Sequence, residues 1–153
     1  MRSARVRAAQ RKRDMNMKHV LVVDDDMATL FAYQKLFRQY SVAFTACGTL
    51  EKALQLITEV PFDAVITDLR LSGEEREEGL DILRCVQILW PDTKAILVTA
   101  HSSDEVREKA FSLGASFYFE KPVHVADMFD ALRKLNIIEE DRTGGAQYAD
   151  AVG

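Results

Sequence analysis

The stretch VLVVDDD at residues 20–26 decides the fold. Its first four residues are branched and apolar, which is typical of a short strand buried on both faces of a parallel sheet. Three aspartates follow directly, so the strand ends abruptly in polar residues. We therefore predict an interior strand over residues 19–23 that delivers Asp24, Asp25 and Asp26 at its carboxyl end.

Further along the chain, strand-like and helix-like segments alternate. Apolar runs predict further strands at residues 41–46, 64–67, 95–99 and 116–119. Helical spacing and capping residues predict helices at 27–40, 49–58, 80–89 and 125–135, and a further helix that is capped by Ser102 or Ser103 and runs to about residue 113. Five strand–helix units in regular succession predict an α/β fold, a doubly wound parallel sheet with helices on both faces.

The carboxyl ends of these strands bring polar groups to one rim, where ligands of such sheets bind. After the acids of the first strand, the third strand delivers Asp68, the fourth delivers Thr99, and the fifth leads into Lys121. Carboxylates gathered at one rim repel each other, so one takes up a proton or a cation neutralises them. Oxygen ligands in a partly open site suit Mg²⁺. Carboxylates, a divalent cation, a lysine and a hydroxyl are the groups that phosphoryl transfer requires. One of the carboxylates can be the nucleophile of this reaction.

Four motifs carry a resemblance to one family. They are VLVVDDD at 20–26, FDAVITDLRLSG at 62–73, ILVTAH at 96–101 and GASFYFEKP at 114–122. In this order, over about residues 19–136, the chain resembles the receiver domain of bacterial two-component response regulators. The resemblance implies a five-stranded, flavodoxin-like sheet of strand order 2-1-3-4-5. It also implies a phosphoacceptor signalling switch, not an enzyme, that at most catalyses phosphorylation and dephosphorylation of its own aspartate.

The resemblance assigns the phosphoryl and metal site to specific residues. Asp68 matches the phosphoacceptor. Asp24 and Asp25 match the acid pair that holds Mg²⁺ together with Asp68, and Asp25 is the more direct ligand of the pair. The backbone carbonyl of Arg70 matches the remaining protein ligand. Asp26 lies outside the acid pair, and we interpret it as a cap or first-turn acid of the following helix.

A second set of residues matches the family's switch. Thr99 matches the hydroxyl that bonds the phosphoryl group, and Lys121 matches the lysine that pairs with it. Pro122 matches a proline whose preceding peptide is typically cis. Tyr118 matches the aromatic residue that turns inward when Thr99 moves.

The loop after Asp68 departs from the family. Ser72 stands where a proline is usual, and the stretch between Asp68 and Gly79 is longer than in the family. The run 74–78 is interpreted as a solvated loop. Arg70 and His101 occupy variable positions beside the acceptor and the switch threonine, which in the family tune the lifetime of the phosphoryl group.

Two other functions are alternatives to the phosphoacceptor switch. The first is a haloacid-dehalogenase-type phosphatase, whose signature is D-x-D-x-T/V. Asp24 and Asp26 fit its acids, but position 28 is alanine and the later acid pair of such enzymes is missing. The second is a degenerate receiver that acts as a constitutive binding module. Loss of the acceptor, the acid pair or the lysine usually marks such a module, and all of them are present here.

The charge distribution suggests three parts. Residues 1–18 hold seven basic residues and one acid, whereas 19–153 hold 13 basic and 23 acidic residues. We predict a basic flexible tail at 1–18, a receiver domain at 19–138 and a flexible C-terminal tail at 139–153. An acidic folded part is a poor candidate for direct nucleic-acid binding.

Composition and resemblance together suggest the setting. No apolar run is long enough to span a membrane, and Cys47 and Cys85 lack metal-ligand or disulfide spacing, so we expect a cytoplasmic protein without membrane insertion. The expected phosphodonor is a histidine kinase or a histidine phosphotransfer protein. We expect a downstream protein to read the face of the fourth helix, fifth strand and fifth helix, where Val106, Lys109, Tyr118 and Phe129 are candidates. We expect a stand-alone receiver without an output domain. It would signal by docking to another protein or by passing its phosphoryl group onward in a relay.

Overall fold

The computed structural model of the chain describes residues 3–7, 17–73, 75–139 and 151–152. Its centre is a five-stranded sheet of order β2-β1-β3-β4-β5 in which all neighbours pair in parallel. The strands are β1 Lys18–Val23, β2 Val42–Cys47, β3 Ala64–Asp68, β4 Lys94–Thr99 and β5 Phe117–Glu120. The α/β fold and the strand order 2-1-3-4-5 are therefore confirmed.

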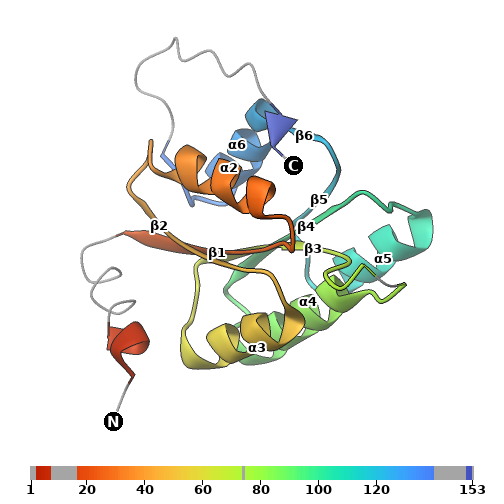
Figure 1. Ribbon diagram of the computed structural model, residues 1–153, viewed down its shortest axis with the longest axis horizontal. Coiled ribbons are helices and arrows are strands. Elements are labelled where there is room, and N and C mark those ends of the chain that lie inside the picture. Colours follow the sequence, from red (N-terminus) through yellow and green to blue (C-terminus); the bar gives the residue numbers. More distant parts are fainter. Residues whose placement is uncertain (1–2, 8–16, 74, 140–150, 153) are drawn as a thin grey trace.

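Helices cover both faces of this sheet, as the prediction required (Figure 1). They are α2 Met27–Phe37, α3 Leu50–Glu59, α4 Glu78–Leu89, α5 Asp104–Ser112 and α6 Val125–Lys134. Figure 1 shows α2 and α6 on one side of the sheet and α3, α4 and α5 on the other. A short strand β6, Val123–His124, precedes α6 and pairs in antiparallel fashion with β7, Ala151–Val152.

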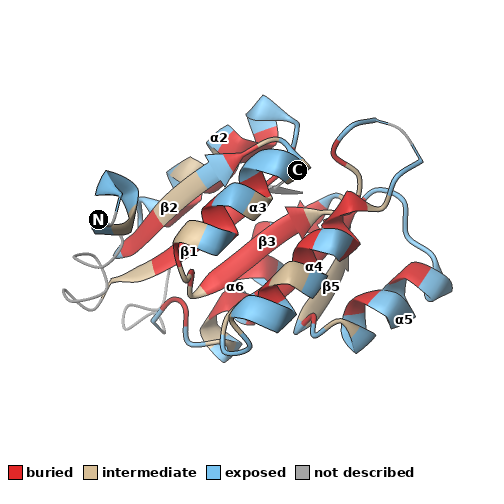
Figure 2. Cartoon of the chain, turned by 90° about the horizontal axis from the view of Figure 1, so that it is seen from below, coloured by how far each residue is buried: buried red, intermediate tan, exposed pale blue. Residues whose placement is uncertain are grey.

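The core follows from the alternation of side chains along the strands. Val20 and Val22 of β1 face the cluster formed with α2 and α6, whereas Leu21 and Val23 face the cluster formed with α3 and α4. All four side chains are at most 1% exposed, and burying each stabilises the fold by about 1.5–3 kcal/mol. Figure 2 shows β1 and β3 buried, while the outer sides of the helices are exposed. Burial on both faces explains the continuous apolar run of the sequence.

Side-chain caps start three of the helices where the sequence offers a short polar residue. The carboxylate of Asp26 accepts from the backbone N–H of Ala28, and the hydroxyls of Thr49 and Ser103 accept from the third residue after each of them. These bonds satisfy N–H groups that have no partner within the helix. The interpretation of Asp26 as a helix cap is confirmed.

Two predicted helix boundaries are wrong. Helix α2 ends at Phe37 rather than at residue 40, because residues 38–41 form a turn that leads into β2. Helix α4 begins at Glu78 rather than at residue 80. Glu78 and Gly79 therefore belong to the first turn of α4, a difference that matters for the site.

The predicted tails fall mostly outside the described residues. Residues 4–7 form a helical turn in which half-buried Val6 packs against the α3–α4 side of the core. The Arg5 guanidinium lies 4.0 Å from the Glu59 carboxylate. The domain boundaries at 18 and 138 stay predictions. Within the described part of the chain, no helix combines the length and the apolar character needed to cross a membrane.

Candidate functional site

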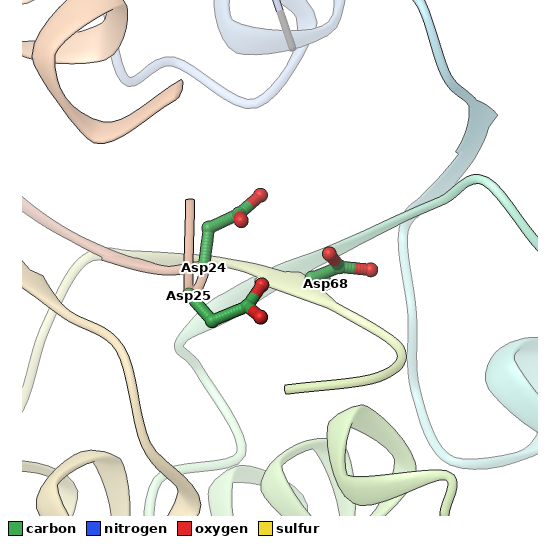
Figure 3. Close-up of side chains that lie close together, drawn as sticks. All are labelled: Asp24, Asp25 and Asp68. Carbon is green, nitrogen blue, oxygen red and sulfur yellow. The ribbon is translucent and has the colours of Figure 1, made fainter. Parts of the chain in front are cut away.

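Three carboxylates meet at the carboxyl end of the sheet. Val23 of β1 lies opposite Thr67 of β3, so the residues that follow each of them emerge side by side. Asp24, Asp25 and Asp68 each offer an oxygen that lies within 4.8 Å of the other two. Figure 3 shows these side chains leaving the ends of the two strands close together. The structure thus brings together the acids that the sequence placed at one rim.

Lys121 joins the acids of the two strands. Its Nζ donates to Asp24 Oδ2 at 2.7 Å and to Asp68 Oδ2 at 3.0 Å. The side chain reaches this place because β5 pairs with β4, and the Lys121 backbone N–H donates to the Thr99 carbonyl at 2.9 Å. The Lys121–Pro122 peptide is cis, as the resemblance predicted.

Burial and charge oppose each other in this cluster. Burial raises the pKa of Asp68 above its ordinary range, Lys121 opposes this shift, and the charge of Asp24 adds to it. Burial by itself lowers the pKa of Lys121, but the hydrogen bonds and charges of Asp24 and Asp68 outweigh it and raise that pKa. Lys121 is therefore a fixed positive charge at neutral pH, placed between two carboxylates.

Thr99 and Tyr118 lie on the same face of the sheet. Tyr118 is opposite Leu97, and Thr99 is two residues further along β4, so the side chains of all three point in one direction. Thr99 is fully buried, and its hydroxyl accepts from the His101 backbone N–H at 2.9 Å. The Tyr118 hydroxyl donates to Ser102 Oγ at 2.8 Å. Tyr118 is thus held on the loop that follows Thr99.

Arg70 lies on a turn whose neighbours are both anchored. Leu69 and Leu71, on either side of it, are 0% and 4% exposed and enter two different core clusters. A hydrogen bond from the Arg70 backbone N–H lowers the pKa of Asp68, against the effect of burial. Half-buried Arg70 therefore lies with its backbone close to Asp68.

Glu78 is a buried residue close to the site that the sequence interpretation missed. Residues 75–77 of the run are exposed or half-buried, but Glu78 is 8% exposed, so its assignment to a solvated loop is wrong. Its Oε1 accepts from Leu71 N, Ser72 N and Ser72 Oγ at 3.2, 3.1 and 2.9 Å. Burial by itself raises the pKa of Glu78, but these hydrogen bonds outweigh it and lower that pKa. The available clue was its place directly before a glycine and an apolar helical run.

Gly79 is required by the close approach of α4 to the acceptor. A Cβ atom at this position would lie 2.3 Å from the Asp68 carbonyl oxygen and 2.8 Å from the Leu69 Cα. The Gly79 N–H donates to the Leu69 carbonyl at 2.8 Å. Only a residue without a side chain allows this hydrogen bond at this distance.

The donor set fits a hard divalent cation. Asp24 is buried, Asp68 is half-buried and Asp25 is exposed, and each supplies a carboxylate oxygen. The Arg70 carbonyl lies two residues after Asp68 in the chain. All of these ligands are oxygens, as Mg²⁺ prefers, and the exposed Asp25 leaves the site open to water. The cluster can therefore hold a cation and still admit a phosphorylated donor.

Comparisons with known proteins show the family of the chain. A family model described as the response regulator receiver domain matches residues 20–133. The chain is similar to the transcriptional regulatory protein ZraR of Escherichia coli K12, with 30% identity over 115 residues that cover 75% of this chain and 25% of ZraR. It is similar to sporulation initiation phosphotransferase F of Bacillus subtilis, with 27% identity over 121 residues, 78% of this chain and 94% of that protein.

A solved structure of a receiver domain has the same fold as this chain. It is a CheY-like response regulator receiver domain protein from Methanospirillum hungatei JF-1, with a TM-score of 0.72 and 27% identity, covering 78% of this chain and 94% of that one. The chain thus spans about a quarter of ZraR but nearly the whole length of the two smaller proteins.

Proposed function

Because the chain belongs to the response regulator receiver family, we propose that it is a signalling switch that accepts a phosphoryl group on Asp68. Receiver domains are signalling switches rather than enzymes, and histidine kinases or phosphotransfer proteins are their partners. The observation that carries the proposal is the bridge from Lys121 to Asp24 and Asp68, at 2.7 and 3.0 Å. A fixed cation beside Asp68 would balance the charge that accumulates when that carboxylate attacks phosphorus.

The proposed step is an in-line transfer from a phosphohistidine. A carboxylate oxygen of Asp68 forms the new P–O bond while the P–N bond of the donor breaks. The electron pair of that bond stays on the imidazole nitrogen, and the ring leaves neutral because its other nitrogen carries a proton. Lys121 balances the charge on the phosphoryl oxygens as the bond forms.

Asp24, Asp25, Asp68 and the Arg70 carbonyl are the proposed Mg²⁺ ligands. Receiver domains typically bind Mg²⁺ at an acidic pocket, and the cluster of three carboxylates supports the same role here. The bound cation would neutralise carboxylates that otherwise repel an anionic donor. Asp24 Oδ2 already contacts Lys121, and Asp24 Oδ1 accepts from Asp26 N at 2.9 Å, so Asp25 is the acid left with exposed oxygens.

Thr99 and Tyr118 are the proposed switch. In the proposed phosphorylated state, the Thr99 hydroxyl donates to a phosphoryl oxygen instead of accepting only from His101, and Tyr118 leaves its hydrogen bond with Ser102 to follow it inward. The added charge stabilises one of two states separated by a few kcal/mol. Support comes from their common face of the sheet and from the hydrogen bond that joins the Tyr118 hydroxyl to Ser102.

The proposed readout face comprises α5, β5 and α6. Of the predicted candidates, Val106 and Phe129 are 7% and 1% exposed, so they belong to the core. Lys109 and Tyr118 stay accessible, and Phe111, 43% exposed, lies near Tyr118 with ring centroids 6.5 Å apart. This face is the proposed site for a downstream protein partner.

Two alternatives are weaker on this geometry. A dehalogenase-type phosphatase would need Asp24 as nucleophile and Asp26 free for acid–base work. Asp24 is 3% exposed, and both carboxylate oxygens of Asp26 accept hydrogen bonds, from Ala28 N and from Thr29 Oγ1. A degenerate binding module would not need the intact bridge at Lys121. A cytoplasmic location is part of the proposal, since the free thiols of Cys47 and Cys85 suit a reducing compartment.

Mass spectrometry tests the proposal. The protein is incubated with acetyl phosphate and Mg²⁺, and the intact mass is compared with that of Asp68→Asn and Asp24→Asn treated in the same way. We expect a gain of one phosphoryl group that Asp68→Asn abolishes and EDTA prevents. A gain that survives Asp68→Asn but disappears in Asp24→Asn supports the phosphatase. No gain with any small phosphodonor, in a protein that binds Mg²⁺, supports the binding module.

A further inference from the structure

The loop between β3 and α4 is organised by one buried carboxylate. Glu78, the first residue of α4, is 8% exposed. Its Oε1 accepts from the backbone N–H of Leu71, the backbone N–H of Ser72 and the Ser72 hydroxyl, at 3.2, 3.1 and 2.9 Å. A buried carboxylate is costly unless it is hydrogen-bonded. These donors therefore explain why glutamate is tolerated here, and they couple the start of α4 to the turn after the acceptor.

The same turn is held on its other side. Leu69 is fully buried, and its carbonyl accepts from the Gly79 N–H at 2.8 Å. Leu71 is buried in a different cluster, with residues of α3 and with Ile82 and Val86 of α4. Arg70 is thus the one residue between two anchors, and Glu78 and Gly79 fix the backbone on both sides of it. The direction of the Arg70 carbonyl depends on these contacts.

We propose that Glu78 is a positioning residue of the metal site, because it holds Leu71 and Ser72 so that the carbonyl of Arg70 faces the cation. The inference rests on the proposed function, since this carbonyl is a ligand only if the site binds Mg²⁺. Mg²⁺ demands near-ideal octahedral geometry and tolerates displaced ligands poorly. Groups that orient ligands from behind therefore affect affinity although they never contact the metal.

Two substitutions of Glu78 and one matched control test the proposal. Glu78→Leu keeps a buried side chain of similar size but removes the acceptor, whereas Glu78→Gln keeps an amide oxygen that accepts the same hydrogen bonds. Glu77→Leu is the control, because Glu77 has the same charge but contacts Lys109 at 3.8 Å instead of the turn. Calorimetric titration of the full chain with MgCl₂ gives the affinity. We expect Glu78→Leu to bind Mg²⁺ about tenfold more weakly, and the other two variants to stay within about twofold of the wild type.

The outcomes separate the inference from the proposed function. Wild-type affinity in a folded Glu78→Leu protein overturns the inference, because a residue that serves only the fold changes thermal stability but not metal binding. If circular dichroism shows that Glu78→Leu does not fold, Ser72→Ala decides. It removes one of the three donors and should weaken Mg²⁺ binding by about fivefold, and an affinity within twofold of the wild type overturns the inference. A wild-type chain that binds no Mg²⁺ and takes no phosphoryl group overturns the proposed function instead.

Discussion

The two loops that carry the acids of the site are built in different ways. The turn after β1 is short and local: Asp24 Oδ1 accepts from Asp26 N at 2.9 Å, and Asp26 accepts from Ala28 N at 3.0 Å. The loop after β3 is long, and Glu78 holds Leu71 across a separation of seven residues. Neighbouring residues therefore place one half of the site, whereas a distant buried carboxylate places the other half. The two halves are joined at Lys121, which contacts an acid from each.

The largest effect, on the rate of phosphorylation, is expected from removing the amino group of Lys121. Lys121→Met keeps much of the side-chain length but leaves Asp24 and Asp68 facing each other without a cation. We expect phosphorylation of Asp68 by acetyl phosphate to slow by about 10²-fold, or roughly 2.7 kcal/mol in the barrier. Rates are measured by quenched mass spectrometry at saturating Mg²⁺.

Lys94→Met is the matched control for this experiment. Lys94 is an exposed lysine at the amino end of β4, the end of the sheet opposite to the site. Its loss should leave the rate unchanged. If Lys121→Met is phosphorylated at the wild-type rate, the two loops do not act as one site, and the bridge is only a contact of the resting state.

The next largest effect concerns the long loop alone. Gly79→Ala places a Cβ atom 2.3 Å from the Asp68 carbonyl, so α4 or the end of β3 must move. We expect a loss of about 1–3 kcal/mol in the free energy of unfolding, as in other overpacked sites. We also expect weaker phosphorylation, since the atoms that move carry the acceptor. Urea denaturation and the acetyl phosphate assay measure the two effects.

Gly48→Ala gives the corresponding experiment next to the short turn. A Cβ atom at Gly48 would lie 3.4 Å from the Asp24 carbonyl, close to ordinary van der Waals contact. The free energy of unfolding should therefore change much less in Gly48→Ala than in Gly79→Ala. Equal losses in the two variants would mean that the close approach of α4 to Asp68 has no special cost.

The same difference between the loop after β1 and the loop after β3 determines which site residues could be predicted from the sequence. Asp24, Asp68 and Thr99 follow directly from apolar runs, and parallel pairing brings the ends of such runs to one rim whatever the loops do. The cap at Asp26 was equally predictable, because it joins residues two apart. Lys121 follows the fifth apolar run in the same way, whereas the switch role of Tyr118 came from the resemblance alone.

The contacts of the long loop could not be predicted in the same way. Glu78 looked like one more acid in a charged run, because its burial depends on where the loop folds back. That path is set by Leu69 and Leu71, which enter different clusters, and by Gly79 against the acceptor strand. None of these tertiary contacts has a periodic signature. The end of α2 at Phe37 was missed for a related reason, since the turn into β2 overrides helical spacing.

The smallest effect is expected at the cap of the short turn. The pKa of Asp26 is lowered, first by the Ala28 backbone hydrogen bond and then by the Thr29 hydroxyl, with burial opposing them. A lowered pKa in the folded state means that the charged form adds stability above the ordinary value of 3.8, and that this contribution is lost as pH falls through the folded-state value. Asp26→Asn keeps a capping oxygen without the charge. Urea midpoints should therefore be slightly lower for Asp26→Asn than for the wild type at pH 6, and the two should converge in acid. A gap that persists or widens in acid would contradict a local, charge-assisted cap, because protonation removes the charge that distinguishes the two proteins.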